Sequence, residues 1–159
     1  MKKVAPLLLI LLLLSGCKVK NYTPEIPLTI NQNVKVTSGD FSYECEICKT
    51  ESDVSVTVNS TSAKGMTMTY DGENLSFSYA DFTYDINGKN FEKQNPAIVV
   101  YEVFDYINST EQLNAKKIDN GFKYEGKISL GDFILIQNED NSLSVLTMRN
   151  IDYKIEFLD

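Results

Sequence analysis

The sequence predicts a mainly β protein of the α+β class, a curved antiparallel sheet or half-barrel with one central amphipathic helix. Short stretches in which apolar and polar residues alternate recur from Phe41 to the C-terminus, a pattern typical of half-buried strands. A single mid-chain segment has a helical period instead. Because parallel strands need a crossover helix between them, so many strands with one helix must form an antiparallel sheet.

The N-terminus has the pattern of a signal peptide. Lys2 and Lys3 precede an apolar run of eleven residues from 4 to 14, and Ser15 and Gly16 lead to Cys17. The run is too short to span a membrane, which takes about 20 residues. Small residues followed by this cysteine resemble the lipobox of bacterial lipoproteins. The resemblance implies cleavage before Cys17 and attachment of lipid, such as palmitate, to its sulfur. A plain secretory signal with an incidental cysteine is the alternative.

Three parts of the chain follow from this interpretation. Residues 1–16 are a lipoprotein signal peptide, residues 17–38 are the lipidated Cys17 and a tether, and residues 39–159 are a half-barrel domain. The tether is predicted from two prolines, several amide residues and the absence of a sustained period between 18 and 39. Two or three acyl chains anchor a protein stably. We therefore expect an extracytoplasmic protein that is lipid-anchored to the bacterial cell membrane.

Alternating residues predict the strands in order. The first is 41–47, with Phe41, Tyr43, Cys45 and Ile47 on one face, and the next is 54–58. Segments 66–70, 75–79 and 82–86 continue the pattern. Residues 71–74 form a predicted turn, and Asn87 with Gly88 is a candidate for a type I′ hairpin turn. After the helix, alternation resumes in 122–130, 132–137, 143–148 and 153–157.

The helix is predicted from residue 96 to about 109. Asn95 is a favourable N-cap and Pro96 suits the first helical position. The apolar residues Val100, Val103, Phe104 and Ile107 recur at helical spacing. Its high content of β-branched residues leaves a strand as the competing interpretation. We expect the apolar stripe to pack on the concave face of the sheet, with Glu102 and Asp105 on a solvated face.

The order of these elements over residues 41–159, together with the lipobox, resembles the LolA, LppX and LprG type of lipoprotein carriers. The resemblance implies a half-barrel whose concave apolar face holds acyl chains under a helical lid. On this basis the ligand-binding residues are predicted on the helix and on the strand 75–79. They are Val100, Val103, Phe104, Ile107, Phe77 and Tyr79.

Composition excludes several classes of function. The chain has no histidine, which removes Ser-His-Asp and Cys-His catalysis and the commonest metal ligand. The mature chain has 13 basic and 22 acidic residues, a net charge of −9, so it repels nucleic acid. The carboxylate pairs Glu102/Asp105 and Glu44/Glu46 are interpreted as solvated surface. We expect no enzyme activity, no cofactor and no metal site.

Cys45 and Cys48 form a C-x-x-C pair within a predicted strand. Three strand residues separate the Cα atoms by about 10 Å, whereas a disulfide spans roughly 4.4–6.8 Å. We therefore favour ordinary strand positions, with Cys45 inward and Cys48 outward. A disulfide at a strand irregularity is the second interpretation, and redox or metal chemistry is the third.

Two functional hypotheses from different classes remain. The first is a membrane-anchored, non-catalytic module that binds lipid or another apolar ligand on the concave face. The second is an envelope module with a filled core that docks a protein partner through a sheet edge or face. The nine tyrosines suit either hypothesis, because a tyrosine has an apolar body and a polar tip. An enzyme that uses carboxylates alone is a third hypothesis and the least favoured.

Overall fold

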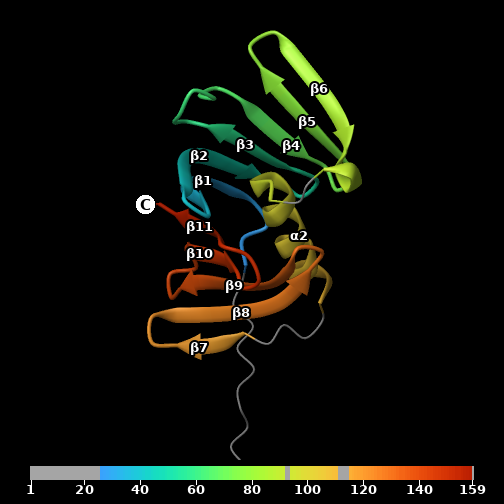
Figure 1. Ribbon diagram of the computed structural model, residues 1–159. Coiled ribbons are helices and arrows are strands. Elements are labelled where there is room, and N and C mark those ends of the chain that lie inside the picture. The colour runs from blue at the N-terminus through green and yellow to red at the C-terminus, as the bar shows by residue number, and fades with distance from the viewer. Residues whose placement is uncertain (1–25, 92–93, 111–114, 159) are drawn as a thin grey trace, which may run out of the picture.

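A computed structural model describes residues 26–91, 94–110 and 115–158, and these residues form one antiparallel sheet and one α-helix (Figure 1). The predicted signal peptide, Cys17 and the first part of the tether lie outside the described residues. The sheet has eleven strands in the order β6-β5-β4-β3-β2-β1-β11-β10-β9-β8-β7. The strands are β1 (Ile30–Ser38), β2 (Phe41–Lys49), β3 (Val54–Val58), β4 (Thr67–Tyr70), β5 (Asn74–Tyr79), β6 (Phe82–Asn87), β7 (Lys116–Ile118), β8 (Gly121–Ile128), β9 (Gly131–Asn138), β10 (Leu143–Met148) and β11 (Tyr153–Phe157).

Strand β1 corrects the predicted domain boundary. Residues 30–38 were assigned to the tether, but they form a nine-residue strand between β2 and β11 at the centre of the sheet. Ile30, Val34 and Val36 face the core and are buried. The remaining positions are mostly polar, and a strand with one solvated face needs apolar residues only on the other. The tether interpretation is therefore wrong for residues 30–38.

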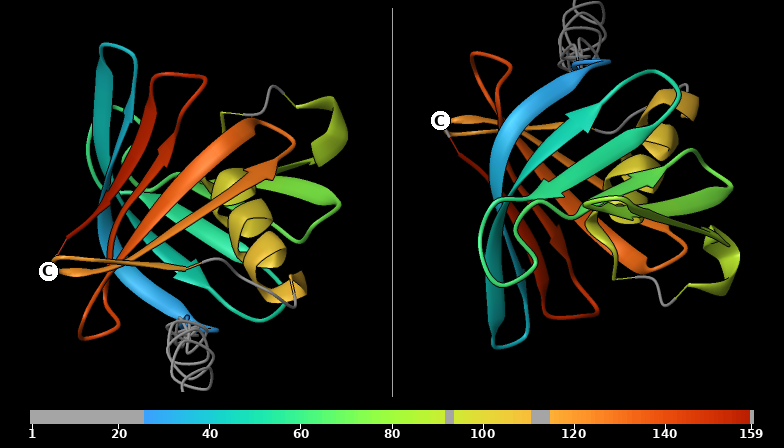
Figure 2. Two further views of the ribbon diagram at one scale, coloured as in Figure 1. Left: turned by 90° about the horizontal axis from the view of Figure 1, so that it is seen from below. Right: turned by 90° about the horizontal axis from the view of Figure 1, so that it is seen from above.

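The sheet curves around the helix α2 (Pro96–Ser109) without closing into a barrel (Figure 2). The strands β6 and β7 end the sheet on its two sides and do not pair with each other. The fold class predicted from the sequence, a curved antiparallel sheet with one central helix, is confirmed. No helix among the described residues is long and apolar enough to cross a membrane.

Helix α2 begins and packs as predicted. The Asn95 side chain accepts a hydrogen bond from the Ala97 amide at 2.9 Å, which satisfies a backbone donor that the first turn leaves free. The helix packs on β3, β4 and β8, so it bridges the two halves of the sheet. Four residues of its apolar stripe are buried against the concave face: Val100, Val103, Phe104 and Ile107.

At two glycines an aromatic ring packs directly against the backbone. A Cβ at Gly126 of β8 would lie 2.4 Å from the Tyr106 ring of α2, so the glycine lets helix and sheet come together. A Cβ at Gly88 would lie 2.4 Å from the Tyr70 ring. Gly88 does not form the predicted hairpin turn with Asn87. It begins the 3₁₀-helix η1 (Gly88–Asn90), which the Asn87 side chain caps by accepting from the Lys89 amide.

Candidate functional site

The candidate site is a pocket of about 580 Å³ beside the N-terminus of α2, between the two halves of the sheet. Its walls are mostly apolar side chains. One half of the sheet and the segment that follows it contribute Met66, Met68, Phe77 and Phe91, and the turns of the other half contribute Leu130 and Ile151. Pockets that bind small molecules are of this size and this composition.

Strand register explains how residues distant in sequence meet in this wall. Met68 of β4 lies directly opposite Phe77 of β5, and opposite residues in an antiparallel pair present their side chains on the same face. The Phe77 ring lies 5.4 Å from the Phe91 ring, centroid to centroid. Asn95, the helix cap, directs its side-chain amide toward the Met68 sulfur at 3.1 Å. The cap that starts the helix therefore also forms part of the pocket.

Two hydrogen-bonded contacts hold the rim of the pocket. The Glu102 carboxylate of α2 accepts hydrogen bonds from both the amide and the hydroxyl of Ser129, at 3.0 and 2.8 Å. These bonds fix the β8–β9 turn, and the next residue of that turn is the pocket residue Leu130. On another side, the Ser38 hydroxyl donates to the Gln94 side chain at 3.1 Å. Glu102 was predicted to lie on a solvated face, and its contact with Ser129 is solvent-exposed but fixes the turn.

Three side chains of the sheet beside the pocket have raised pKa values. Burial raises the pKa of the Cys45 thiol to about 12. Burial, and secondarily the neighbouring Cys45, raises the pKa of the pocket residue Tyr43. Burial also raises the pKa of Tyr153. The Tyr153 side chain is buried and its hydroxyl has no hydrogen-bond partner. These three groups are neutral at pH 7, so they bring no charge to the sheet beside the pocket.

The predicted binding residues separate into three groups. Phe77 lines the pocket. The helix residues Val100, Val103, Phe104 and Ile107 are at most 6% exposed and fill the core. They do not line the pocket, because they are packed between the helix and the sheet. Tyr79 is 51% exposed and lies farther along β5.

Sequence reasoning missed most of the pocket wall. Met66 and Met68 were recognised only as strand residues, although methionine side chains are common where a surface must adapt to a ligand. Leu130 and Ile151 belong to turns, and no periodic pattern marks them. Only the curvature of the sheet brings these turns opposite Met68 and Phe77.

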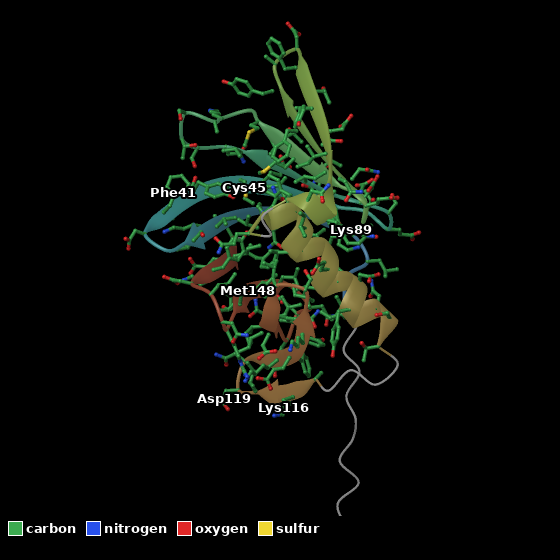
Figure 3. The ribbon with its side chains drawn as sticks, turned by 45° about the vertical axis from the view of Figure 1, so that its right-hand side comes forward. Phe41, Cys45, Lys89, Lys116, Asp119 and Met148 are labelled. Carbon is green, nitrogen blue, oxygen red and sulfur yellow. The ribbon has the colours of Figure 1, made fainter. Side chains whose placement is uncertain are left out.

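Beyond the pocket, the hairpin β5–β6 carries exposed aromatic residues. Tyr79 pairs with Phe82 across the hairpin, and Phe77 pairs with Tyr84. Phe82 is 80% exposed and Tyr84 is 68% exposed. Figure 3 shows the far end of this hairpin projecting beyond the helix and away from the other half of the sheet. The apolar row that begins in the pocket therefore continues onto an open surface.

The remaining candidate chemistry is limited. Cys45 is buried and Cys48 is exposed, as predicted from their strand parity, and both are free thiols. Among the described residues, no three Asp, Glu or Cys side chains are grouped in a way that could hold a metal ion. Glu44 and Glu46 lie on the exposed face of β2, as predicted.

No protein-family model matches the chain, and no curated protein matches it in sequence. Solved structures match it in fold. One belongs to the complex of the CwlD amidase with the GerS lipoprotein from Clostridioides difficile, at a TM-score of 0.51 and 14% identity, covering 100% of this chain and 95% of that chain. Another is a LolA superfamily protein from Nitrosomonas europaea, at a TM-score of 0.41 and 12% identity, covering 86% of each chain. The neighbour at a TM-score of 0.51 agrees with the fold class predicted from the sequence, and at 14% identity it concerns the fold alone.

Proposed function

We propose that this chain is a non-catalytic lipoprotein, anchored to the outside of a bacterial cell membrane through Cys17, whose concave pocket takes up a lipid or another apolar ligand. The main support for this proposal is the pocket beside the N-terminus of α2. It has a volume of about 580 Å³ and mostly apolar walls, within the range of known small-molecule sites, about 300–1,000 Å³.

The chemistry of the walls supports an apolar ligand in particular. Met66 and Met68 are unbranched and flexible, so they adapt to ligands of irregular shape. Among the described residues that line the pocket, none carries a charged side chain. Since an unpaired charge is costly to bury, a pocket without a counter-charge selects against ionic ligands.

The anchor rests on the sequence of the N-terminus. Basic residues, a short apolar run, small residues and Cys17 follow one another in the order of a lipoprotein signal. Metabolic labelling with palmitate tests it. We expect label on the wild-type chain and none on Cys17→Ser, whereas equal labelling of both would contradict lipid attachment at this residue.

Ligand uptake is tested with the mature chain carrying Cys17→Ser and secreted through an ordinary signal peptide. This protein has no covalently attached lipid, so any lipid that it carries is bound non-covalently. Native mass spectrometry is expected to show co-purified lipid. A fluorescent fatty acid titrated against the same protein should bind, and Phe77→Arg in the pocket should weaken binding at least tenfold.

Phe82→Arg is the matched control, because Phe82 lies on the same sheet face but outside the pocket. It should leave the affinity for the fatty acid unchanged. Absence of both co-purified lipid and probe binding in a folded wild-type protein would contradict the proposal.

Docking of a protein partner is a second candidate function, favoured by the exposed aromatic residues of β5–β6. The neighbour at a TM-score of 0.51 comes from a complex of an amidase with a lipoprotein. Partner docking predicts the opposite pattern in a cellular assay: Phe82→Arg abolishes function, and Phe77→Arg preserves it.

A further inference from the structure

The two ends of the sheet differ in how they meet solvent. β7 has three residues, and its exposed Lys116 and Lys117 form ion pairs with Glu125 and Glu139 at 3.6 Å each. Short length and lysines are the usual protection of a sheet edge against pairing with another chain. β6 has six residues, no lysine and two exposed aromatic side chains. It is the terminal strand of the sheet formed by the described residues, so its outer backbone groups are open to a further strand.

The hydrogen bonds of the hairpin identify these outer groups. The Gly88 amide donates to the Glu73 carbonyl at 2.8 Å, and hydrogen-bonded pairs recur at every second position of an antiparallel ladder. Ile86, Tyr84 and Phe82 therefore direct their backbone groups inward to β5. Thr83 and Asp85 direct theirs outward.

Charge selects one way in which two copies of this edge can pair. A two-fold axis at Tyr84 places Thr83 opposite Asp85 of the second copy, with Phe82 opposite Ile86. An axis at Asp85 would place two Asp85 carboxylates opposite each other. An axis at Thr83 would place Asp85 opposite Asp81. Like charges directly opposite each other destabilise a strand pair, so of these three central axes the one at Tyr84 avoids this repulsion, and it also pairs more of the strand than an axis nearer either end.

We propose that β6 pairs antiparallel with β6 of a second copy of this chain, about a two-fold axis at Tyr84. Thr83 and Asp85 of each copy exchange the backbone hydrogen bonds. The two Tyr84 side chains meet at the axis in a non-hydrogen-bonded pair, where side chains approach most closely. Aromatic pairs across strands are favourable, and this one covers side chains that are exposed in the single chain.

The dimer joins the concave faces of two chains. The exposed row of Phe82 and Tyr84 becomes the middle of one continuous sheet instead of its margin. Two six-residue edges bury less surface than a standard interface of about 1,600 Å². Association should therefore be weak in dilute solution and be strengthened where anchored chains are concentrated on a membrane, and a cross-linking experiment in the cell is the suitable test.

The test uses the full chain in its native membrane, with Cys48→Ser to remove the exposed native thiol. Tyr84→Cys, Thr83→Cys and Asp85→Cys are compared after mild oxidation with copper phenanthroline. We expect a disulfide-linked homodimer to form at least tenfold more with Tyr84→Cys than with the other two variants. Stronger cross-linking through Thr83→Cys or Asp85→Cys would overturn the pairing register. No homodimer from any variant present at wild-type abundance, or cross-linking only to a different protein, would overturn the dimer.

Charge at position 83 supplies a second measurement on the same interface. Thr83→Lys places an ammonium opposite Asp85 of the second copy and should raise the yield of cross-linked Tyr84→Cys dimer. Thr83→Asp places a carboxylate there and should lower the yield several-fold. The same substitutions at Ser78, which lies beside Thr83 on β5, are the matched controls and should change the yield far less. Equal effects of Lys and Asp at position 83 would also overturn the register.

Discussion

The two halves of the sheet have the same hairpin architecture, but one half is filled and the other is open. From β11 to β8, the concave face is occupied by buried residues such as Leu146, Leu135, Phe133 and Tyr124. On the other side, β2 to β4 are covered, whereas β5 and β6 end in the exposed Tyr79, Phe82 and Tyr84. A fourteen-residue helix is about 21 Å long. Eleven strands about 4.8 Å apart extend over roughly 48 Å. One helix therefore cannot cover the whole face.

Stability and binding therefore depend on different parts of the sheet. Buried contacts under α2 hold the two halves together, and the uncovered apolar side chains add little to folding because they are already in water. The same side chains provide surface for a ligand or a second chain.

Phe104 and Phe82 form the first comparison. Phe104 is 0% exposed between α2 and the sheet, and Phe82 is 80% exposed. Phe104→Ala should lower the free energy of unfolding by about 3–5 kcal/mol. Phe82→Ala should change it by about 0.5 kcal/mol or less. Urea denaturation followed by circular dichroism measures both, and similar losses would contradict the division into a filled and an open half.

Two buried tyrosines form the second comparison. The Tyr124 hydroxyl donates to the Gln137 side-chain oxygen at 2.7 Å, whereas the Tyr153 hydroxyl has no partner. Tyr124→Phe should cost about 1–2 kcal/mol, because it leaves a buried acceptor with one bond fewer. Tyr153→Phe should cost nothing or stabilise the fold. A loss at Tyr153 equal to that at Tyr124 would mean that its hydroxyl is hydrogen-bonded in solution.

The third comparison concerns the rim contact on α2. Glu102→Gln weakens the bonds to Ser129 and should cost about 1 kcal/mol or less, since the contact is solvent-exposed. Asp105→Asn removes the same charge from an exposed position of the same helix and is the control. Thermal unfolding of both variants measures the difference, and equal midpoints would show that the rim contact adds no stability.

The smallest effect on folding concerns the two thiols. Burial raises the pKa of Cys45 from 9.0 to about 12, so at pH 8 this thiol is both protonated and inaccessible. Iodoacetamide should alkylate Cys48 in the native protein and reach Cys45 only after denaturation. Cys48→Ser should abolish native labelling of this pair.

The raised pKa of Cys45 also sets the sign of a pH dependence. The folded state keeps the thiol protonated where the unfolded state loses the proton. Its contribution to stability is therefore fully present below pH 9 and is lost as the pH rises from 9.0 to about 12. Unfolding measured above pH 9 should show less alkaline destabilisation in Cys45→Ala than in the wild type.

Local signals in the sequence predicted much of the fold. Alternation over Phe41–Ile47 placed Cys45 inward and Cys48 outward, because side chains of a strand alternate between faces whatever lies around it. Asn95 and Pro96 marked the start of the helix, since capping depends on the nearest backbone groups. β1 was missed because its only strong signals are Val34 and Val36, and pairing with both β2 and β11 compensates for its polar residues.

The candidate site was only partly predictable, because a local pattern does not show what lies opposite it in the fold. Phe77, one of the predicted binding residues, lies in the pocket wall, whereas the predicted helix residues are buried in the core. An apolar stripe on a helix is the same pattern whether it faces a cavity or a sheet, and the contact distance between α2 and β8 decides between them. That distance depends on Gly126, where a larger residue would meet the Tyr106 ring.

The sequence by itself determined the antiparallel strands, the capped helix, the parity of the cysteines and the expectation of a lipid anchor at Cys17. Each of these depends on residues close together along the chain. Only the tertiary structure decided that Leu130 and Ile151 face Met68 across a pocket, that Glu102 holds the β8–β9 turn, and that β6 is an open edge. These features arise because the curvature and order of the strands bring distant segments together, and no local pattern encodes how far a sheet bends before its face is covered.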